Sequence, residues 1–222
     1  MFKKVLIADD IDFNDIAAVQ VLEDLEIPEI AYSKYCDDAL LKIKRAYKDN
    51  EPYELLISDL SFKADCRENT LNSGEELISA VKQLFPEIKI IVFSIEDKSY
   101  RIKSLFDKYG INGFVMKGRN SIVELKKAVE VTCQNKQKYL SPDLNYILQD
   151  KTVNEIDNYD IQLIKYLSKG VTQENMATAF VEAGITPNSK STIEKRLNKL
   201  KIYFKANNPA HLVAIAKDLG LV

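Results

Sequence analysis

The sequence predicts an α/β domain with a doubly wound parallel sheet, followed by a small all-α domain. Three observations predict this arrangement. Short apolar runs alternate with longer amphipathic runs over residues 1–135, only helical patterns follow over 157–222, and the segment 136–156 is polar and lacks sustained periodicity. Alternating strands and helices are typical of a parallel sheet covered by helices on both faces. We therefore expect a first domain over 1–135, a linker over 136–156 and a second domain over 157–222.

Five strands and five helices are expected in the first domain. The strands are predicted at 5–8, 30–35, 55–58, 88–93 and 113–116, because each is a short apolar run. The helices are predicted at 14–25, 37–47, 74–84, 99–109 and 122–135, where apolar residues recur at helical spacing. Open sheets with this (βα)5 pattern carry their functional crevice at the carboxyl ends of the strands.

Four helices are expected in the second domain. Glycines end the first two, at 160–168 and 174–182. A serine, either Ser189 or Ser191, opens the third helix, which runs to about residue 204. The fourth begins with Asn208 as N-cap and Pro209 at the first helical position, and it ends at residue 220.

Composition excludes several classes of protein. The 222 residues are 46% hydrophobic, which is enough to bury a core. His211 is the only histidine, so a histidine-based zinc site or a Ser/His/Asp triad is excluded. The three cysteines lie far apart without metal-ligand spacing, which favours reduced thiols in the cytoplasm. No apolar run reaches the ~20 residues of a membrane span, so we expect a soluble intracellular protein.

Polar residues follow four of the predicted strands. Asp9 and Asp10 follow the first strand, Asp59 the third, Ser94 the fourth and Lys117 the fifth. In a doubly wound sheet the first and third strands are neighbours, so the three carboxylates converge and need a cation among them. Mg²⁺ fits a set of hard oxygen ligands that also faces a phosphate. These residue types suit phosphoryl transfer, with a carboxylate as nucleophile and a metal ion and an ammonium neutralising the transferring oxygens.

The motifs ADD at 8–10, ISDLSF at 57–62, VFSIED at 92–97 and GFVMKG at 113–118 resemble, in order and spacing, those of the receiver domain of two-component response regulators, over roughly residues 1–130. The resemblance implies the flavodoxin-like receiver fold, with Asp59 as phosphoacceptor. It implies Mg²⁺ bound by Asp9, Asp10, Asp59 and the backbone carbonyl of Ser61. It also implies that Ser94 and Lys117 sense the phosphoryl group and that Phe114 is the switch aromatic.

Two features depart from the family pattern. Fifteen steps separate Asp59 from Gly74, which is longer than usual, and the intervening polar loop lacks the family's proline. Ile95 follows Ser94, where the family prefers a small side chain. A bulky residue there could slow phosphorylation, slow dephosphorylation, or indicate a receiver that works without phosphate.

A basic helix dominates the second domain. Residues 190–205 hold six basic residues and one acidic residue, although the whole chain has a net charge of −2. On a helix, Ile193, Leu197 and Leu200 form one apolar stripe, which leaves a polar face that is either simply solvated or suited to phosphates and base edges in a major groove. The candidate DNA contacts are Ser191, Thr192, Glu194, Lys195, Asn198 and Lys199.

The run from residue 170 to 221, including STIEKRLNKL and NPAHLVAIAKDLGL, looks like the LuxR-type (NarL/FixJ class) helix-turn-helix DNA-binding domain, over 157–222. The resemblance implies a recognition helix at about 189–203, with readout positions at Glu194, Lys195 and Asn198. The loop before this helix is longer than the family's tight turn. Glu194 either completes a capping box with Ser191 or accepts a hydrogen bond from a cytosine amino group.

The leading expectation is a response regulator rather than a turnover enzyme. It implies a histidine kinase as phosphate donor, double-stranded DNA as ligand and a homodimer on activation. One alternative is a pseudo-receiver adaptor that works without phosphate. A weaker alternative is a haloacid-dehalogenase-type phosphatase, because Asp10 and Asp12 match its D-x-D motif, although no acidic pair follows Lys117.

Overall fold

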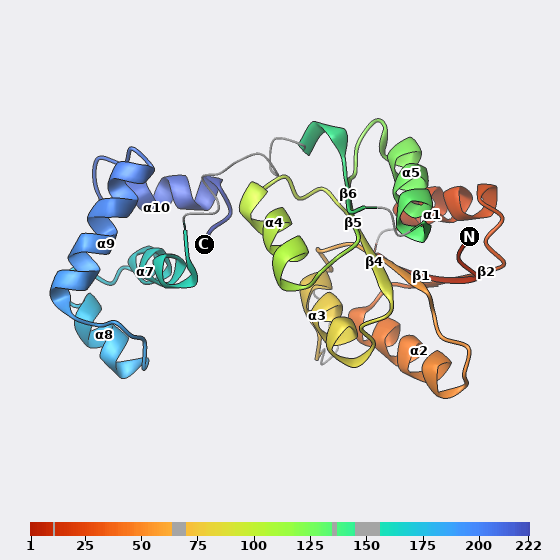
Figure 1. The fold of residues 1–222 in the computed structure, drawn as a ribbon, viewed down its shortest axis with the longest axis horizontal. Helices are drawn as coiled ribbons and strands as arrows, with labels where there is room; N and C mark the ends of the chain where they lie inside the picture. The colour runs from red at the N-terminus through yellow and green to blue at the C-terminus, as the bar shows by residue number, and fades with distance from the viewer. Residues whose placement is uncertain (11, 64–69, 135–136, 145–155) are drawn as a thin grey trace. The chain divides into compact units, whose positions relative to one another are not determined.

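Six parallel strands form one sheet in the order β2-β1-β3-β4-β5-β6 (Figure 1). They are β1 (Lys4–Ala8), β2 (Glu29–Ser33), β3 (Leu55–Ser58), β4 (Lys89–Ser94), β5 (Gly113–Met116) and β6 (Tyr139–Leu140). Strands β1 and β3 are neighbours, with Ala8 beside Ser58, as expected. The residues that follow them, Asp9 and Asp59, therefore leave the sheet side by side.

Helices cover both faces of this sheet (Figure 1). They are α1 (Asp12–Asp24), α2 (Cys36–Lys48), α3 (Gly74–Leu84), α4 (Ser99–Lys108) and α5 (Ser121–Cys133). Apolar residues of α1 and α5 pack on one face, against alternate residues of the strands such as Ile7, Ile57 and Val115. Burial on both faces explains why the strands read as continuous apolar runs rather than alternating ones.

The computed structural model describes residues 1–10, 12–63, 70–134, 137–144 and 156–222, and the side chains of residues 12–17 and 100 are outside that description. The described chain divides into two compact units. The first is built from Met1–Asp97 and Ile102–Asn145, and the second contains the four C-terminal helices. Among the described residues, no helix combines the length and the apolar character needed to cross a membrane.

The predicted (βα)5 alternation is confirmed, and the sheet has one strand more. Strand β6 lies inside the segment expected to be a linker and pairs in parallel with β5. Ser141, which follows it, is buried; its amide donates to the Phe114 carbonyl at 3.0 Å, and its hydroxyl accepts from the Met116 amide at 2.9 Å. The first part of the expected linker therefore belongs to the sheet, and residues 145–155 lie outside the described part.

The described part of the second unit contains α7 (Asn158–Ser168), α8 (Met176–Glu182), α9 (Lys190–Tyr203) and α10 (Pro209–Asp218). The predicted stripe of Ile193, Leu197 and Leu200 on α9 is buried in its core, together with Met176 and Phe180 of α8. The predicted start of α10 is confirmed, because the Asn208 side chain accepts from the His211 amide at 2.8 Å.

The predicted capping box at the start of α9 is wrong. Ser189 is the N-cap, and its hydroxyl accepts a hydrogen bond from the Thr192 amide at 3.3 Å. Ser191 lies inside the first turn, so it cannot form the box with Glu194. Two serines two residues apart gave the same sequence signal, and in the structure α9 begins at Lys190, directly after Ser189.

Candidate functional site

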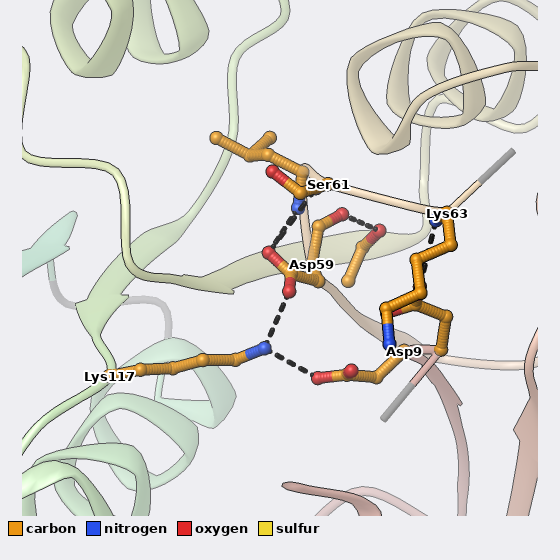
Figure 2. Close-up of polar contacts among 8 residues, drawn as sticks. Asp9, Asp59, Ser61, Lys63 and Lys117 are labelled. Atoms are coloured by element: carbon orange, nitrogen blue, oxygen red, sulfur yellow. Dashed lines mark hydrogen bonds and ion pairs between the residues drawn. The ribbon is translucent and has the colours of Figure 1, made fainter. Parts of the chain in front are cut away.

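Asp59 lies directly after β3 at the carboxyl edge of the sheet and is 5% exposed. Its Oδ1 accepts from the Leu60 amide at 2.6 Å and, at a longer 3.4 Å, from the Ser61 amide. Its Oδ2 faces the ammonium of Lys117 (Figure 2). One carboxylate oxygen is thus held by the backbone, and the other faces the polar interior of the crevice.

Lys117 joins the first and third strands electrostatically. Its Nζ lies 2.6 Å from Asp59 Oδ2 and 2.7 Å from Asp9 Oδ2, and all three side chains are less than a tenth exposed (Figure 2). The same Nζ lies 5.3 Å from the centroid of the Phe93 ring. A buried ammonium between two buried carboxylates neutralises part of their mutual repulsion. Of the three carboxylates expected to converge, Asp9 and Asp59 meet, with the Lys117 ammonium between them.

Asp10 turns to a different partner. Its Oδ2 accepts from the Lys63 amide at 2.8 Å, at the start of the loop that follows β3. Over the described ranges, no three acidic, cysteine or histidine side chains form a group that could hold a metal ion. Carboxylate and carbonyl oxygens are the donors that Mg²⁺ prefers, so the chemistry of Asp9, Asp10, Asp59 and the Ser61 carbonyl fits this ion.

Ser94 ends β4 in a fully buried position. Within the described residues its hydroxyl has no hydrogen-bond partner, which is unusual for a buried polar atom. Its carbonyl accepts from the Lys117 amide at 2.8 Å, so the two residues are tied through the backbone. An orphaned hydroxyl at this edge is a donor available for an anionic oxygen.

Phe114 is fully buried, between Val92 on β4 and Leu140 on β6 in the strand register, so its ring lies inside the first unit. Its role as a switch residue stays a prediction. Ile95 is 72% exposed, so its bulk does not fill the buried space beside Ser94. Residues 64–69 of the long loop between Asp59 and Gly74 lie outside the described residues.

The candidate DNA contacts lie on α9. Ser191, Glu194, Lys195, Asn198 and Lys199 are exposed, and Thr192 is half-buried. The predicted polar face opposite the apolar stripe is therefore present, carrying two lysines and an amide. Side chains of this kind suit contacts with phosphates and base edges.

The sequence interpretation missed two parts of these sites. Phe93 contacts Lys117, and strand register could have indicated it, because both side chains project from the same face of neighbouring strands. Arg196 on α9 reaches Asp157 and Asp160, across more than thirty residues of sequence. No local sequence pattern predicts an ion pair over such a separation.

A six-stranded parallel sheet carries the buried Asp9, Asp59 and Lys117 at its carboxyl edge, and a helical unit follows it. Solved structures of the RcsB response regulator share this fold. One from Salmonella typhimurium matches with a TM-score of 0.69 at 20% identity, covering 96% of this chain and 98% of that chain. An RcsB–DNA complex matches with a TM-score of 0.65 at 20% identity, covering 98% of each chain.

The first unit has a match of its own. The isolated REC domain of RcsB from Salmonella enterica serovar Typhimurium, solved in the presence of phosphomimetic BeF3-, matches with a TM-score of 0.52 at 23% identity, covering 65% of this chain and 97% of that chain. No family model and no curated protein sequence matches the chain. The fold resemblance inferred from the motifs is thus confirmed through structure.

Proposed function

We propose that the protein is a response regulator: a transcription regulator that binds double-stranded DNA and is controlled by Mg²⁺-dependent phosphorylation of Asp59. The observation that carries this proposal is the ammonium of Lys117, held between buried Asp9 and Asp59 at the sheet edge. There the Ser94 hydroxyl has no hydrogen-bond partner in the part of the chain that the structure describes. RcsB structures with the same fold contain DNA or a phosphomimetic, which supports both halves of the proposal.

Asp59 is the nucleophile in this proposal. A carboxylate oxygen attacks the phosphorus of a phosphohistidine on a histidine kinase; the new O–P bond forms as the P–N bond breaks, and the imidazole leaves with the electron pair. The Lys117 ammonium and the free Ser94 hydroxyl donate to oxygens of the transferred group. The resulting acyl phosphate is a modified state of the protein, so the protein is phosphorylated stoichiometrically and does not turn over a substrate.

Asp9, Asp10, Asp59 and the Ser61 carbonyl would hold Mg²⁺ beside the phosphoryl group. The ion would neutralise charge on the transferring oxygens. Asp10 would have to give up its hydrogen bond from the Lys63 amide or share it. Lys117 would move from between the carboxylates toward the phosphoryl oxygens, and that displacement would be transmitted to β5 and to Phe114.

The exposed face of α9 is the proposed recognition surface. Lys195, Asn198 and Lys199 would contact phosphates and base edges, with Ser191, Thr192 and Glu194 beside them. Activation would favour a homodimer, which places two such helices on two half-sites. The widely spaced cysteines, with free thiols at Cys36 and Cys133, support a cytoplasmic location.

One set of measurements tests the proposal. With a small phosphodonor and Mg²⁺, the wild type should acquire an acid-labile phosphoryl group, and Asp59→Asn should not. The same variant separates the proposal from a haloacid-dehalogenase-type reaction, which would use Asp10 as nucleophile and would leave the labelling of Asp59→Asn intact. Labelling that survives Asp59→Asn overturns the assignment. Molecular mass and duplex affinity, measured with and without beryllofluoride, then test activation. If beryllofluoride changes neither quantity, the phosphate-independent adaptor is the remaining interpretation.

A further inference from the structure

Arg196 differs from the other basic residues of α9 in where its side chain lies. Lys195 and Lys199 are exposed, whereas the Arg196 side chain is 27% exposed. Its Nη2 donates to Asp157 Oδ2, and its Nε lies 2.9 Å from Asp160 Oδ1 in an ion pair that does not have hydrogen-bond geometry. The guanidinium is therefore engaged with two carboxylates of α7 rather than presented to solvent.

The two carboxylates are themselves fixed by the start of α7. Asp157 is the N-cap: its Oδ1 accepts from the Asp160 amide at 2.9 Å, and Asp160 Oδ2 accepts from the Asp157 amide at 3.3 Å. Burial raises the pKa of Asp160, which is 2% exposed, and Arg196 opposes that shift. Each acid uses one oxygen for the capping box and turns the other to Arg196.

Tyr159 extends these contacts to α8 and to the loop before α9. The Arg196 guanidinium carbon lies 5.6 Å from the centroid of the Tyr159 ring. The Tyr159 hydroxyl donates to the Pro187 carbonyl at 2.6 Å, and its ring meets Phe180 of α8 edge-on at 5.6 Å. One cluster, made of Asp157, Tyr159, Asp160 and Arg196, thus joins α7, α8, α9 and the loop that leads into α9.

We infer that Arg196 is a positioning residue for DNA recognition. It fixes the rotation of α9 about its own axis, so that the exposed Lys195, Asn198 and Lys199 face outward together. The inference rests on the proposed function, since it concerns the same recognition surface. Arginine suits the task and lysine does not, because a planar guanidinium presents separate nitrogens to two carboxylates while it lies near an aromatic ring.

Asp157→Asn gives a test in which positioning and simple electrostatics predict opposite signs. Asparagine is as good an N-cap as aspartate, so α7 should keep its start. Removing a negative charge near the basic surface should by itself strengthen duplex binding. Weakening the hold on Arg196 should instead lower the affinity for a preferred duplex, which can be selected from a random pool with the wild-type full chain. The matched control is Glu182→Gln, an exposed acid on α8 outside the cluster.

Arg196→Lys is the second variant, measured at several salt concentrations against the selected duplex and an unrelated duplex. We expect affinity for the selected duplex to fall about tenfold, with binding to the unrelated duplex and the salt slope unchanged. Lys199→Gln should lower both affinities and reduce the salt slope by about 0.9, as loss of one phosphate contact does. Circular dichroism of each variant verifies that the helices remain folded.

The outcomes separate this inference from the proposed function. If the wild type shows no salt-dependent duplex binding, the proposed function fails and this inference fails with it. If the wild type binds and Asp157→Asn binds as tightly or more tightly, only the positioning role is overturned. A reduced salt slope in an Arg196→Gln variant would also overturn it, because that result would make Arg196 a phosphate contact.

Discussion

Gly74 lies so close to Asp59 that no side chain fits between them. A Cβ built on Gly74 would be 1.8 Å from the carbonyl oxygen of Asp59 and 2.9 Å from the Cα of Leu60. The Gly74 amide donates to the Leu60 carbonyl at 3.0 Å, so the start of α3 is fastened to the residues that carry the candidate nucleophile. The long loop after β3 therefore returns to the site at one tightly packed point.

Gly74→Ala should destabilise the first unit and disturb Asp59. A methyl group there forces backbone to move, and overpacking of this kind costs about 1–3 kcal/mol. We expect a lower free energy of unfolding in denaturant titrations and slower phosphoryl labelling. Gly118→Ala is the matched control, because nothing lies within 4 Å of its Cβ position. Equal stability of the two variants would contradict the close approach.

Lys117→Met should make the site depend on an added cation. Removing the ammonium takes the shared ion-pair partner away from the two buried carboxylates, Asp9 and Asp59. Breaking a buried ion pair lowers the free energy of unfolding by about 3–5 kcal/mol. Mg²⁺ should recover part of that loss, since a free concentration of about ten times the Kd contributes about 1.4 kcal/mol. The increase in melting temperature on adding Mg²⁺ should therefore be larger in the variant than in the wild type.

Lys63→Met is the control for that experiment, because the exposed Lys63 side chain is near the site while its amide makes the contact with Asp10. It should respond to Mg²⁺ as the wild type does. An identical Mg²⁺ response in all three proteins would show that Lys117 and the ion do not compete for the same carboxylates.

Cys36 should make the protein sensitive to alkali. Burial, followed by the charges of Asp37 and Glu76, raises the pKa of this thiol from 9.0 to about 12, although it is the first residue of α2. In the unfolded chain this thiol ionises near its ordinary pKa of 9.0. The stability that the protonated thiol contributes is therefore complete below pH 9.0 and is lost as the pH rises toward 12. The loss is at most about 1.4 kcal/mol per pH unit.

Cys36→Ala should remove this part of the alkaline loss. The free energy of unfolding, measured at about pH 7 and about pH 10, should fall less between the two in the variant than in the wild type. Cys133→Ala, at a partly exposed thiol, should behave as the wild type. At neutral pH, iodoacetamide should modify Cys133 readily and Cys36 poorly. Rapid modification of Cys36 in the folded protein would refute the buried, protonated thiol.

The fold could be predicted from the sequence where a pattern repeats within one element. Strands β3 and β5 and helix α3 have the predicted bounds, because a buried run or an apolar stripe ends there at a polar residue or a glycine. Strand β6 could not be predicted in this way. It has two residues, Tyr139 and Leu140, and is held by the hydrogen bonds of Ser141 to β5, which are tertiary contacts.

The candidate site was predictable in its residues and not in its contacts. Strand ends indicated that Asp9, Asp59 and Lys117 would meet, but a lysine has several rotatable bonds, and only packing decides that its ammonium bridges both acids. Likewise, Phe114 was identified by its spacing from Lys117, and its burial depends on β6. Long-range pairs of this kind depend on the completed fold.

The start of α9 gives a prediction that separates two serines. Ser189 is the N-cap and its hydroxyl also lies 2.8 Å from the Thr192 hydroxyl, whereas Ser191 is an exposed residue of the first turn. Ser189→Ala should cost about 1 kcal/mol of stability in the second unit, because the Thr192 amide loses its hydrogen-bond acceptor. Ser191→Ala should change stability by less than about 0.5 kcal/mol, as exposed substitutions usually do. Thermal unfolding of the two variants decides the register, and a larger loss in Ser191→Ala would restore the capping box with Glu194.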